Sequence, residues 1–584
     1  MSDTAVESKK LPQVAQIEKW MPGVRAIRTY NRAWLAKDLV AGMVLCALLV
    51  PQGMAYAELA GLPAITGLYT TIVCLFAYAV FGPSPYLVLG PDSSLGPMIA
   101  AAILPLAMGD EAYAVALAGM MALFVGLVSA GAGIARLGFV ADLLSSPVRL
   151  GYLAGLAVTI FIGQLPKLFG FSVDADSFLG EIAAFVQNLN QTNVYALGVG
   201  LLCLIIILGL KRWKPNWPGI LIAVLAAIVA TMVLNLAAKG VDTVGILPQG
   251  FPAPSFPRVN LADIPILAAT AVGISLVAIG DTISTSAGFA ARRGYEIDSD
   301  QEMVGIGTAN LFAGIFSGFP VSTSSSRTAV AEQSGAKTQL TGVVAGLLVL
   351  IMLLFVPGLV QYLPQPALAA IVITASISLF DLKALRRLYT MRKSEFILAV
   401  VCALGVMLVG VLEGIIIAVV VAILQFFERS WRPHTAILGE PTTVDGYHDI
   451  TRYPDAIQIP DLLMIRWDAP LFFANANIFR KTIRDLLLQM YPQPFWVLVA
   501  AEPVTDIDVT AAEVLIDLDE ELNASGIHLV FAELSDPVKD KIVRYGLLET
   551  IDSRHFYPTL ETAVAAFYEE KKKHLKEPPS GLPT

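Results

Sequence analysis

Residues 318–330, GFPVSTSSSRTAV, are the part of the sequence that is most informative about the fold, and they lie among apolar segments. Hydroxyl side chains fill the middle of this stretch, and Arg327 follows them directly. One apolar segment earlier, the sequence ISLVAIGDTISTSAGF at 274–289 contains Asp281. A charged side chain inside a bilayer costs a few kcal/mol or more, so such residues typically face a polar cavity that serves function. Two opposite charges and a row of hydroxyls therefore predict a membrane-embedded site for an anion.

The composition around this stretch is that of a membrane protein. Of 584 residues, 56% are hydrophobic and 15% are charged, and the mean hydropathy is +0.68. Roughly fourteen apolar segments lie between residues 39 and 428, many of them near the length that spans a bilayer. The chain is thus predicted to be an α-helical polytopic membrane protein with a transmembrane domain at 39–430. No nucleotide-binding loop or nucleic-acid patch occurs, which favours transport without a cofactor over catalysis, ATP-driven transport or nucleic-acid binding.

The transmembrane domain contains an internal repeat. Short apolar segments led by GPDSS at 90–94 and by STSSSR at 322–327 occupy corresponding places in two halves, 39–238 and 264–428. Each half holds seven predicted spans, and because seven is odd, the two halves run through the bilayer in opposite directions. Short, polar-led segments at matching places in two repeats indicate discontinuous helices at a binding site. The predicted fold is therefore a 7+7 inverted repeat.

Charge distribution predicts the orientation and the remaining domains. Basic residues concentrate in the even-numbered loops, and acidic residues concentrate in the odd-numbered ones, which places both termini in the cytoplasm of a cell-membrane protein. Residues 1–38 are predicted to form a cytoplasmic N-terminal segment, and 439–573 a cytoplasmic α/β domain. The tail at 574–584 is predicted to be disordered. All five histidines follow the last span, so no imidazole is available for a metal site within the membrane.

Two helix N-termini are predicted to hold the anion. Backbone N–H groups and the helix dipole favour an anion at such a terminus without a full positive charge. Arginine also suits an oxyanion, so Arg327 is predicted to contact the substrate, although it could instead be a structural counter-ion of Asp281. Gln52 follows Pro51 in the first span, where its amide could bind a polar substrate or satisfy the carbonyl group that the proline frees. Both interpretations of Gln52 remain open.

Asp281 and Thr285 form a candidate cation site. They are four residues apart and therefore share one face of a helix. A carboxylate with a hydroxyl one turn away can hold Na⁺ or carry a proton, whereas a purely structural aspartate is the alternative. Glu58 and Glu302 lie near predicted span ends, where they are expected to reach the interface or cap a helix.

At these residues the chain resembles the SulP sulphate-permease family, also called solute carrier family 26. The resemblance rests on LLVPQGMAYAELAGLPAITGLY at 48–69, on the stretch 288–330 that ends in the hydroxyl run, and on DAPLFFANANIFRKTI at 468–483. It implies fourteen helices, a core and a gate domain, a homodimer, and an anion held between the third and tenth helices with the eighth alongside. The implied site residues are Gln52, Tyr56, Ser93, Ser94, Asp281, Ser324, Ser326 and Arg327.

The stretch at 468–483 is similar to the STAS domain that closes these transporters. Asp508, Val509 and Thr510 stand where related STAS proteins have a phosphorylatable serine, so Asp508 and Thr510 are candidate regulatory residues. The glycine that usually follows is Ala511 here, and Thr510 could simply be a helix N-cap. A cytoplasmic protein partner of this domain is also expected.

The sequence as a whole predicts a secondary active transporter of a small inorganic anion, with sulphate as the first choice and H⁺ or Na⁺ symport as the mode. A Na⁺-dependent bicarbonate transporter or a dicarboxylate transporter of the same family is the alternative, because hydroxyls and helix dipoles bind many anions, chloride included. A nucleobase transporter of related fold and a regulator that senses an anion are rival classes. Many family members carry glutamate at the position of Asp281, which leaves the coupling ion open.

Overall fold

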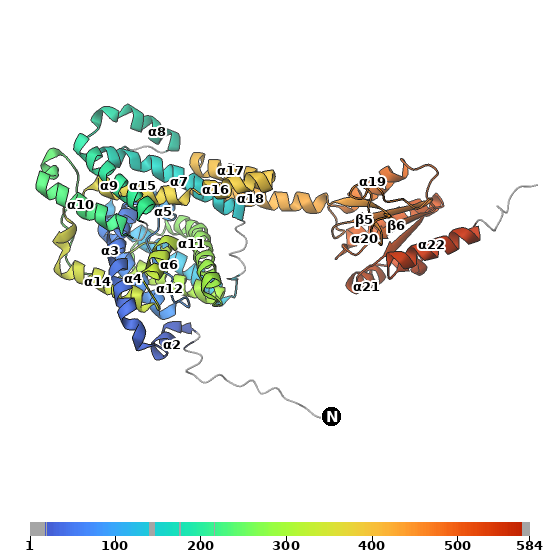
Figure 1. The fold of residues 1–584 in the computed structure, drawn as a ribbon, viewed down its shortest axis with the longest axis horizontal. Coiled ribbons are helices and arrows are strands. Elements are labelled where there is room, and N and C mark those ends of the chain that lie inside the picture. Colours follow the sequence, from blue (N-terminus) through green and yellow to red (C-terminus); the bar gives the residue numbers. More distant parts are fainter. Residues whose placement is uncertain (1–17, 19, 139–145, 174–176, 215–216, 575–584) are drawn as a thin grey trace, which may run out of the picture. The chain divides into compact units, whose positions relative to one another are not determined.

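The computed structural model describes residues 18, 20–138, 146–173, 177–214 and 217–574 (Figure 1). The chain divides into two compact units, Met1–Val421 and Ala422–Thr584, which are described separately. Of the predicted N-terminal segment, only 18 and 20–38 fall in these ranges, and of the predicted tail, only His574.

The first unit is built from apolar helices, as the hydropathy pattern predicts. Seven helical stretches in the described ranges are long and apolar enough to cross a membrane by themselves, and shorter apolar helices accompany them. Counted along those ranges, fourteen helices correspond to the predicted spans: α3 (Leu35–Leu59), α4 (Ala64–Phe81), α5 (Gly96–Ala107), α6 (Glu111–Ile134), α7 (Ser146–Phe169), α9 (Val194–Trp213), α10 (Gly219–Leu234), α11 (Ile264–Arg293), α12 (Ser299–Ile315), α13 (Ser325–Gln333), α14 (Leu340–Phe355), α15 (Gln365–Leu379), α17 (Lys393–Leu408) and α18 (Val411–Trp431). Shorter, peripheral helices are α2 (Pro22–Arg28), α8 (Phe178–Gln187) and α16 (Leu382–Met391).

The two short helices α5 and α13 are entered through extended chain. Strand β1 (Leu89–Gly90) pairs antiparallel with β2 (Ser322–Thr323), so that Leu89 faces Thr323 and Gly90 faces Ser322. Backbone groups in hydrocarbon must be hydrogen-bonded, and non-helical backbone persists there only where protein or a cavity surrounds it. The two-stranded ladder meets part of this requirement, and it brings the starts of α5 and α13 together.

The helices of the first unit pack in two groups. The core group comprises α3 to α6 and α11 to α14, in which α6 packs on α11 and α12, and α14 packs on α3 and α4. The gate group comprises α7, α9, α10, α15 and α17, in which α7 packs on both α15 and α17. Helix α3 also contacts α10 and α15, so it lies where the two groups meet.

Asp38 fixes the loop that follows α13. This carboxylate is fully buried and accepts hydrogen bonds from the backbone N–H groups of Lys337 (2.7 Å) and Thr338 (3.2 Å). The hydroxyls of Thr338, Thr341 and Tyr30 also donate to it, at 2.8, 3.1 and 3.1 Å. These hydrogen bonds stabilise the buried charge of Asp38. They also connect the start of α3 to the chain between α13 and α14.

Glu302 corrects a prediction, because it neither reaches an interface nor caps a helix end. Its side chain is fully buried on α12 and accepts hydrogen bonds from Tyr78 of α4 (2.6 Å), from Ser286 of α11 (2.7 Å) and from Ser84. The Ser84 and Ser286 hydroxyls also lie 3.0 Å apart. Four segments of the core group thus meet at the Glu302 carboxylate. Its partners lie on other elements, so the sequence around Glu302 does not predict its burial.

We expect Glu302→Ala to destabilise the core group much more than Glu302→Gln. Alanine leaves three buried hydroxyls without their acceptor, at a cost of about 1–3 kcal/mol for each group left unsatisfied. Glutamine keeps the volume and one carbonyl oxygen, and the hydroxyls can rotate to accept from its amide. Thermal unfolding of the purified variants in one detergent measures the difference. Equal melting temperatures for the two variants would contradict the role of Glu302 as a hydrogen-bond centre.

The second unit is an α/β domain, as predicted for the C-terminal region. Its six-stranded sheet has the order β4-β3-β5-β6-β7-β8, in which β5 to β8 are parallel and β3 is antiparallel to its neighbours. The elements are β3 (Thr435–Gly439), β4 (His448–Asp449), β5 (Leu462–Trp467), α19 (Ala476–Leu487), β6 (Trp496–Ala500), α20 (Val509–Ala524), β7 (His528–Ala532), α21 (Asp536–Arg544), β8 (Phe556–Tyr557) and α22 (Leu560–His574).

Side chains on the strands alternate between the two faces of the sheet, which gives this domain two hydrophobic layers. On β5, Ile465 faces the layer that contains Phe479 of α19, whereas Met464 faces the layer that contains Phe567 of α22. Successive side chains of a strand point to opposite faces, so a strand that is apolar throughout must be covered on both. Helices on both faces satisfy this requirement (Figure 1).

The start of α20 corrects the predicted cap. The N-cap residue is Asp508 and not Thr510, since Asp508 Oδ1 accepts a hydrogen bond from the Ala511 N–H group at 2.7 Å. Asp508 Oδ2 accepts another from the Phe473 N–H group at 2.8 Å. The Thr510 side chain is exposed in the first turn of the helix. Asp508 therefore stabilises the start of α20. Of the two candidate regulatory residues, Thr510 is the one whose exposed hydroxyl could accept a phosphoryl group.

Candidate functional site

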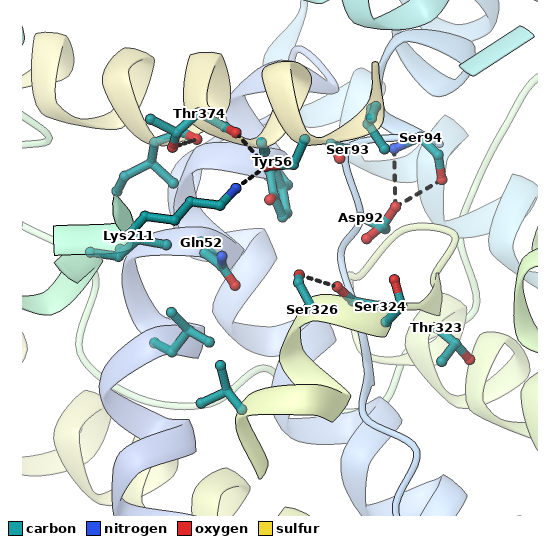
Figure 2. A pocket seen from close by; sticks show the side chains of 18 of the residues that line it. Gln52, Tyr56, Asp92, Ser93, Ser94, Lys211, Thr323, Ser324, Ser326 and Thr374 are labelled. Carbon is teal, nitrogen blue, oxygen red and sulfur yellow. Dashed lines mark hydrogen bonds between the residues drawn. The ribbon is translucent and has the colours of Figure 1, made fainter. Parts of the chain in front are cut away.

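A cavity of about 980 Å³ lies between the core group and the gate group. Its lining includes most of the predicted site residues, and Figure 2 shows how several of them face a common space. The predicted residues that line it are Gln52, Tyr56, Ser93, Ser94, Asp281, Thr285, Ser324 and Ser326. The sequence-based prediction thus names residues from four separate segments that the fold brings to one cavity.

Helix α3 contributes Gln52 and Tyr56, which lie four residues apart and therefore on one face. Both side chains are almost fully buried, with 6% and 5% of their surface exposed. Gln52 Oε1 has no hydrogen-bond partner among the described residues. Buried polar atoms are nearly always paired, so an unpaired oxygen on a cavity wall indicates a place for water or a ligand.

The start of α5 is held by Asp92. One of its oxygens, Oδ2, accepts hydrogen bonds from the Ser94 N–H group (3.1 Å) and from the Ser94 hydroxyl (2.8 Å). The same hydroxyl lies 3.2 Å from Asp281 Oδ2 on α11. Ser94 therefore connects the first broken helix to the helix that carries the candidate cation site.

The start of α13 faces the same cavity. Ser324 is its N-cap residue, and the Ser324 and Ser326 hydroxyls lie 3.1 Å apart and point into the space shown in Figure 2. Ser322, in β2, is fully buried, and its Oγ has no partner among the described residues. Ser322 does not line the cavity, so the unpaired N–H groups of the first helical turn and the Ser324 and Ser326 hydroxyls make the environment that suits an anion.

Asp281 lies at the junction of these elements. Its Oδ1 accepts a hydrogen bond from the Tyr152 hydroxyl of α7 at 3.1 Å, and its Oδ2 lies 3.2 Å from the Ser94 hydroxyl. Thr285 lines the cavity one turn further along α11. Within the described ranges, no lysine or arginine forms an ion pair with Asp281. A carboxylate that lacks a fixed cation and lines a cavity can accept a mobile one.

Arg327 is placed differently from the prediction. It is fully buried and does not line the cavity. Its Nη2 lies 3.5 Å from the carbonyl oxygen of Gly90 and 3.5 Å from Asp92 Oδ1. A Cβ atom at Gly90 would lie 2.8 Å from Nη1, so glycine is needed there to admit the guanidinium. Arg327 is therefore paired with Asp92 and not with Asp281, and it lies behind the strand that leads into α5.

Two basic residues of the gate group, Arg149 and Lys211, line the cavity although the sequence does not predict them there, and it does not predict the nearby buried Tyr152 either. Arg149 and Tyr152 of α7 donate hydrogen bonds to Ser284 and Asp281 of α11, and Lys211 of α9 donates one to Ser378 of α15 at 2.8 Å. Arg149 and Lys211 are among the basic residues that the predicted orientation assigns to the even-numbered loops. Tyr152 lies in an apolar segment with no polar run nearby to mark it. The available signal was the spacing of Arg149 and Tyr152, which puts both on one helix face.

In the part of the chain that the structure describes, no three His, Cys, Asp or Glu side chains are grouped so that they could hold a metal ion. A cation at Asp281 would therefore have that carboxylate and oxygens such as those of Thr285 and Ser94 as its neighbours, with the Asp92 carboxylate on the other side of Ser94.

The comparison with known proteins identifies the family. A model described as "Sulfate permease family" matches residues 35–403, and a model of the STAS domain matches residues 453–563. The chain belongs to the sulfate permease family. It is 40% identical over 550 residues to "Probable sulfate transporter MT1781" of Mycobacterium tuberculosis strain CDC 1551, with 94% of this chain and 98% of that protein covered. It is 31% identical over 573 residues to "Sulfate transporter 4.1, chloroplastic" of Arabidopsis thaliana, with 95% and 84% covered.

Solved structures share the fold. The murine Slc26a9 anion transporter in its inward-facing state matches with a TM-score of 0.88 at 22% identity, over 97% of both chains. The transmembrane domain of the cyanobacterial bicarbonate transporter BicA matches with a TM-score of 0.59 at 21% identity, over 68% of this chain and 97% of that one. The predicted membership of the sulfate permease family and the predicted fold, a helical multi-pass unit followed by a STAS domain, are confirmed.

Proposed function

We propose that this sulfate permease homologue is a secondary active transporter of a small inorganic anion, with sulphate as the principal substrate and H⁺ or Na⁺ as the symported ion. The observation that supports the proposal most is the convergence of two broken-helix starts, at Ser94 and Ser324, on one cavity beside Asp281. Both curated relatives described above are named as sulfate transporters, which favours sulphate over other anions.

The coupling follows from the charge of Asp281. An ionised carboxylate next to the starts of α5 and α13 repels an anion, and the repulsion disappears when the carboxylate binds a cation. By reciprocity, a bound anion then tightens cation binding to the same degree, which is the logic of symport. Transport requires the core group to move against the gate group. The hydrogen bonds from Tyr152 and Arg149 to α11 cross that boundary and must break during the movement.

Na⁺-coupled bicarbonate transport is the second candidate. Thr285 stands one turn from Asp281 in the same cavity wall, so a dehydrated Na⁺ would find a carboxylate and a hydroxyl there. Dicarboxylate transport uses the same donors. Uptake of a neutral nucleobase is disfavoured, because a wall of hydroxyls and helix N-termini suits an anion better.

The proposal also assigns a setting to the transporter. The chain acts as a homodimer in the cell membrane with both termini in the cytoplasm, which agrees with the basic residues of the even-numbered loops. Its STAS domain is then accessible to a cytoplasmic protein partner, and the exposed Thr510 is the proposed point of regulation.

One uptake panel tests the proposed function. Proteoliposomes are loaded with the full chain, and uptake of radiolabelled sulphate, bicarbonate, succinate, chloride and uracil is measured with and without Na⁺ at two pH values. We expect sulphate to accumulate only under an inward H⁺ or Na⁺ gradient. Accumulation of uracil but of no anion, or gradient-independent uptake of every anion, would contradict the proposal. Accumulation of bicarbonate but not sulphate under a Na⁺ gradient would select the second candidate.

A further inference from the structure

Arg149 occupies an unusual position for a basic residue of the gate group. It is partly exposed and lines the cavity from the gate group, whereas the helix starts belong to the core group. Among the described residues of the lining, the basic ones are Arg149 and Lys211. Arg327, which the sequence predicts as the anion's cation, is buried outside the lining. A substrate in this cavity would therefore meet the guanidinium of Arg149 before that of Arg327.

The guanidinium of Arg149 retains unused donors. Arginine has five N–H donors and no acceptor. One nitrogen, Nη1, donates to the Ser284 hydroxyl, and in the described ranges Arg149 forms no ion pair with a carboxylate. The remaining donors are available to the cavity. Lys211 is less suited to this task, because it is a point charge without a planar fork and already donates to Ser378.

Neighbouring contacts fix where the guanidinium stands. Tyr152 follows Arg149 by one helical turn on α7, and Ser284 follows Asp281 by one turn on α11. The bonds from Arg149 to Ser284 and from Tyr152 to Asp281 therefore join matching turns of the two helices, which run past each other in opposite directions. Arg149 lies one helical turn from the tyrosine that binds Asp281, and in the described ranges it forms no direct ion pair with that carboxylate. Its free donors thus lie at the same end of the cavity as the Asp281 carboxylate and the start of α5.

The charge available to a bound anion leaves a place for Arg149. A helix N-terminus presents roughly half an elementary charge, so the starts of α5 and α13 together offer about one positive charge. The charge of Arg327 is compensated by Asp92. A monovalent anion is matched by the two helix starts, whereas a divalent oxyanion has one further negative charge. The guanidinium of Arg149 is a formal cation with a fork of donors. It matches this additional negative charge and can bind two oxygens of a tetrahedral anion.

We propose that Arg149 contacts the transported anion and gives the carrier its preference for divalent over monovalent oxyanions. This inference rests on the proposed function, and it assigns the charge selectivity to the gate group, whereas the hydroxyls and helix starts of the core group bind any small anion. Because α7 does not belong to the core group, the contact forms only while the core group stands in the conformation described here. A divalent substrate thus stabilises this conformation more than a monovalent one does.

The test compares Arg149→Gln with Arg149→Lys in the full chain. Half-saturation of radiolabelled sulphate uptake is measured in proteoliposomes, together with the concentrations of nitrate and chloride that compete with it. We expect Arg149→Gln to raise the half-saturation concentration for sulphate by about tenfold or more, the scale of one charge-assisted hydrogen bond. The potency of nitrate and chloride should change by less than about threefold, so that the ratio between the two classes shifts. Arg149→Lys keeps the charge without the planar fork, so its half-saturation concentration for sulphate should lie between those of the wild type and Arg149→Gln.

A matched control separates this effect from net charge. Arg292→Gln removes one positive charge from the end of α11, outside the cavity, where Arg292 stacks on Phe289 and donates to the Gly288 carbonyl. It should leave the sulphate-to-nitrate ratio unchanged. An equal loss of affinity for sulphate and nitrate in Arg149→Gln, or no loss for either, would overturn the inference while leaving the proposed function intact. If Arg149→Gln does not fold, an unshifted ratio in Arg149→Lys overturns it equally. Failure of the wild-type chain to take up any inorganic anion would instead remove the proposed function.

Discussion

Asp281→Asn is expected to abolish gradient-driven accumulation of the anion. Asparagine is close to aspartate in size; its amide oxygen can accept the hydrogen bond from Tyr152 and its NH₂ group can donate to the Ser94 hydroxyl, but it cannot bind a proton or hold Na⁺ through a negative charge. The variant should therefore lose the difference between uptake with and without the driving gradient. Coupling energies typically correspond to about 5- to 150-fold in affinity, so cation-dependent stimulation should fall by a factor in that range.

Proteoliposome uptake of radiolabelled sulphate with an imposed H⁺ or Na⁺ gradient measures this loss. Counterflow without any gradient, in the same vesicles, shows whether the variant still binds and exchanges the anion. Asp281→Glu is the matched control, because it restores a carboxylate at the cost of one extra methylene. Gradient-driven accumulation by Asp281→Asn at the wild-type level would remove Asp281 from the coupling mechanism.

The sequence is most informative about the fold where polar residues interrupt apolar runs. Membrane helices must satisfy their own backbone, so a run such as Gly90 to Ser94 in hydrocarbon can only be a break beside a cavity. That physical constraint is strong enough to predict the short helices α5 and α13, their place in two halves and their common site. The pairing of Leu89 with Thr323 could not be predicted, because nothing local specifies the register of two-residue strands.

Prediction of the site was limited by side-chain direction. Arg327 stands in a nine-residue helix, whose few turns do not define a polar and an apolar face, and the structure turns it toward Asp92. Arg149 and Tyr152 share one face of α7, but their partners on α11 lie much further along the chain. The spacing of residues therefore does not predict the contacts between the two helices. Glu302 shows the same limit, since its partners come from other elements. Local pattern identifies which segments form the cavity, whereas tertiary packing decides which side chains face it.

Arg327→Ala is expected to cause a large loss of stability. The guanidinium is fully buried beside the Gly90 carbonyl and Asp92, and removing it leaves the Asp92 charge without its cation and a void behind β1. Removing one partner of a buried ion pair typically costs about 3–5 kcal/mol. Because Asp92 holds the start of α5 through Ser94, the anion site should also be distorted, and anion affinity should fall with stability. Thermal unfolding and calorimetric titration with sulphate measure the two effects.

A double variant distinguishes the role of Arg327 as a counter-ion from direct contact with the anion. Asp92→Asn added to Arg327→Ala removes the unpaired charge, so most of the lost stability should return, and the coupling between the two changes is read from the double-mutant cycle. Asp92→Asn alone leaves the guanidinium of Arg327 unpaired and serves as the second single variant of the cycle. If Arg327 acts only through Asp92, sulphate affinity should recover together with stability. Recovery of stability without recovery of affinity would show that the arginine reaches the anion itself, and full stability of Arg327→Ala would contradict the buried pair.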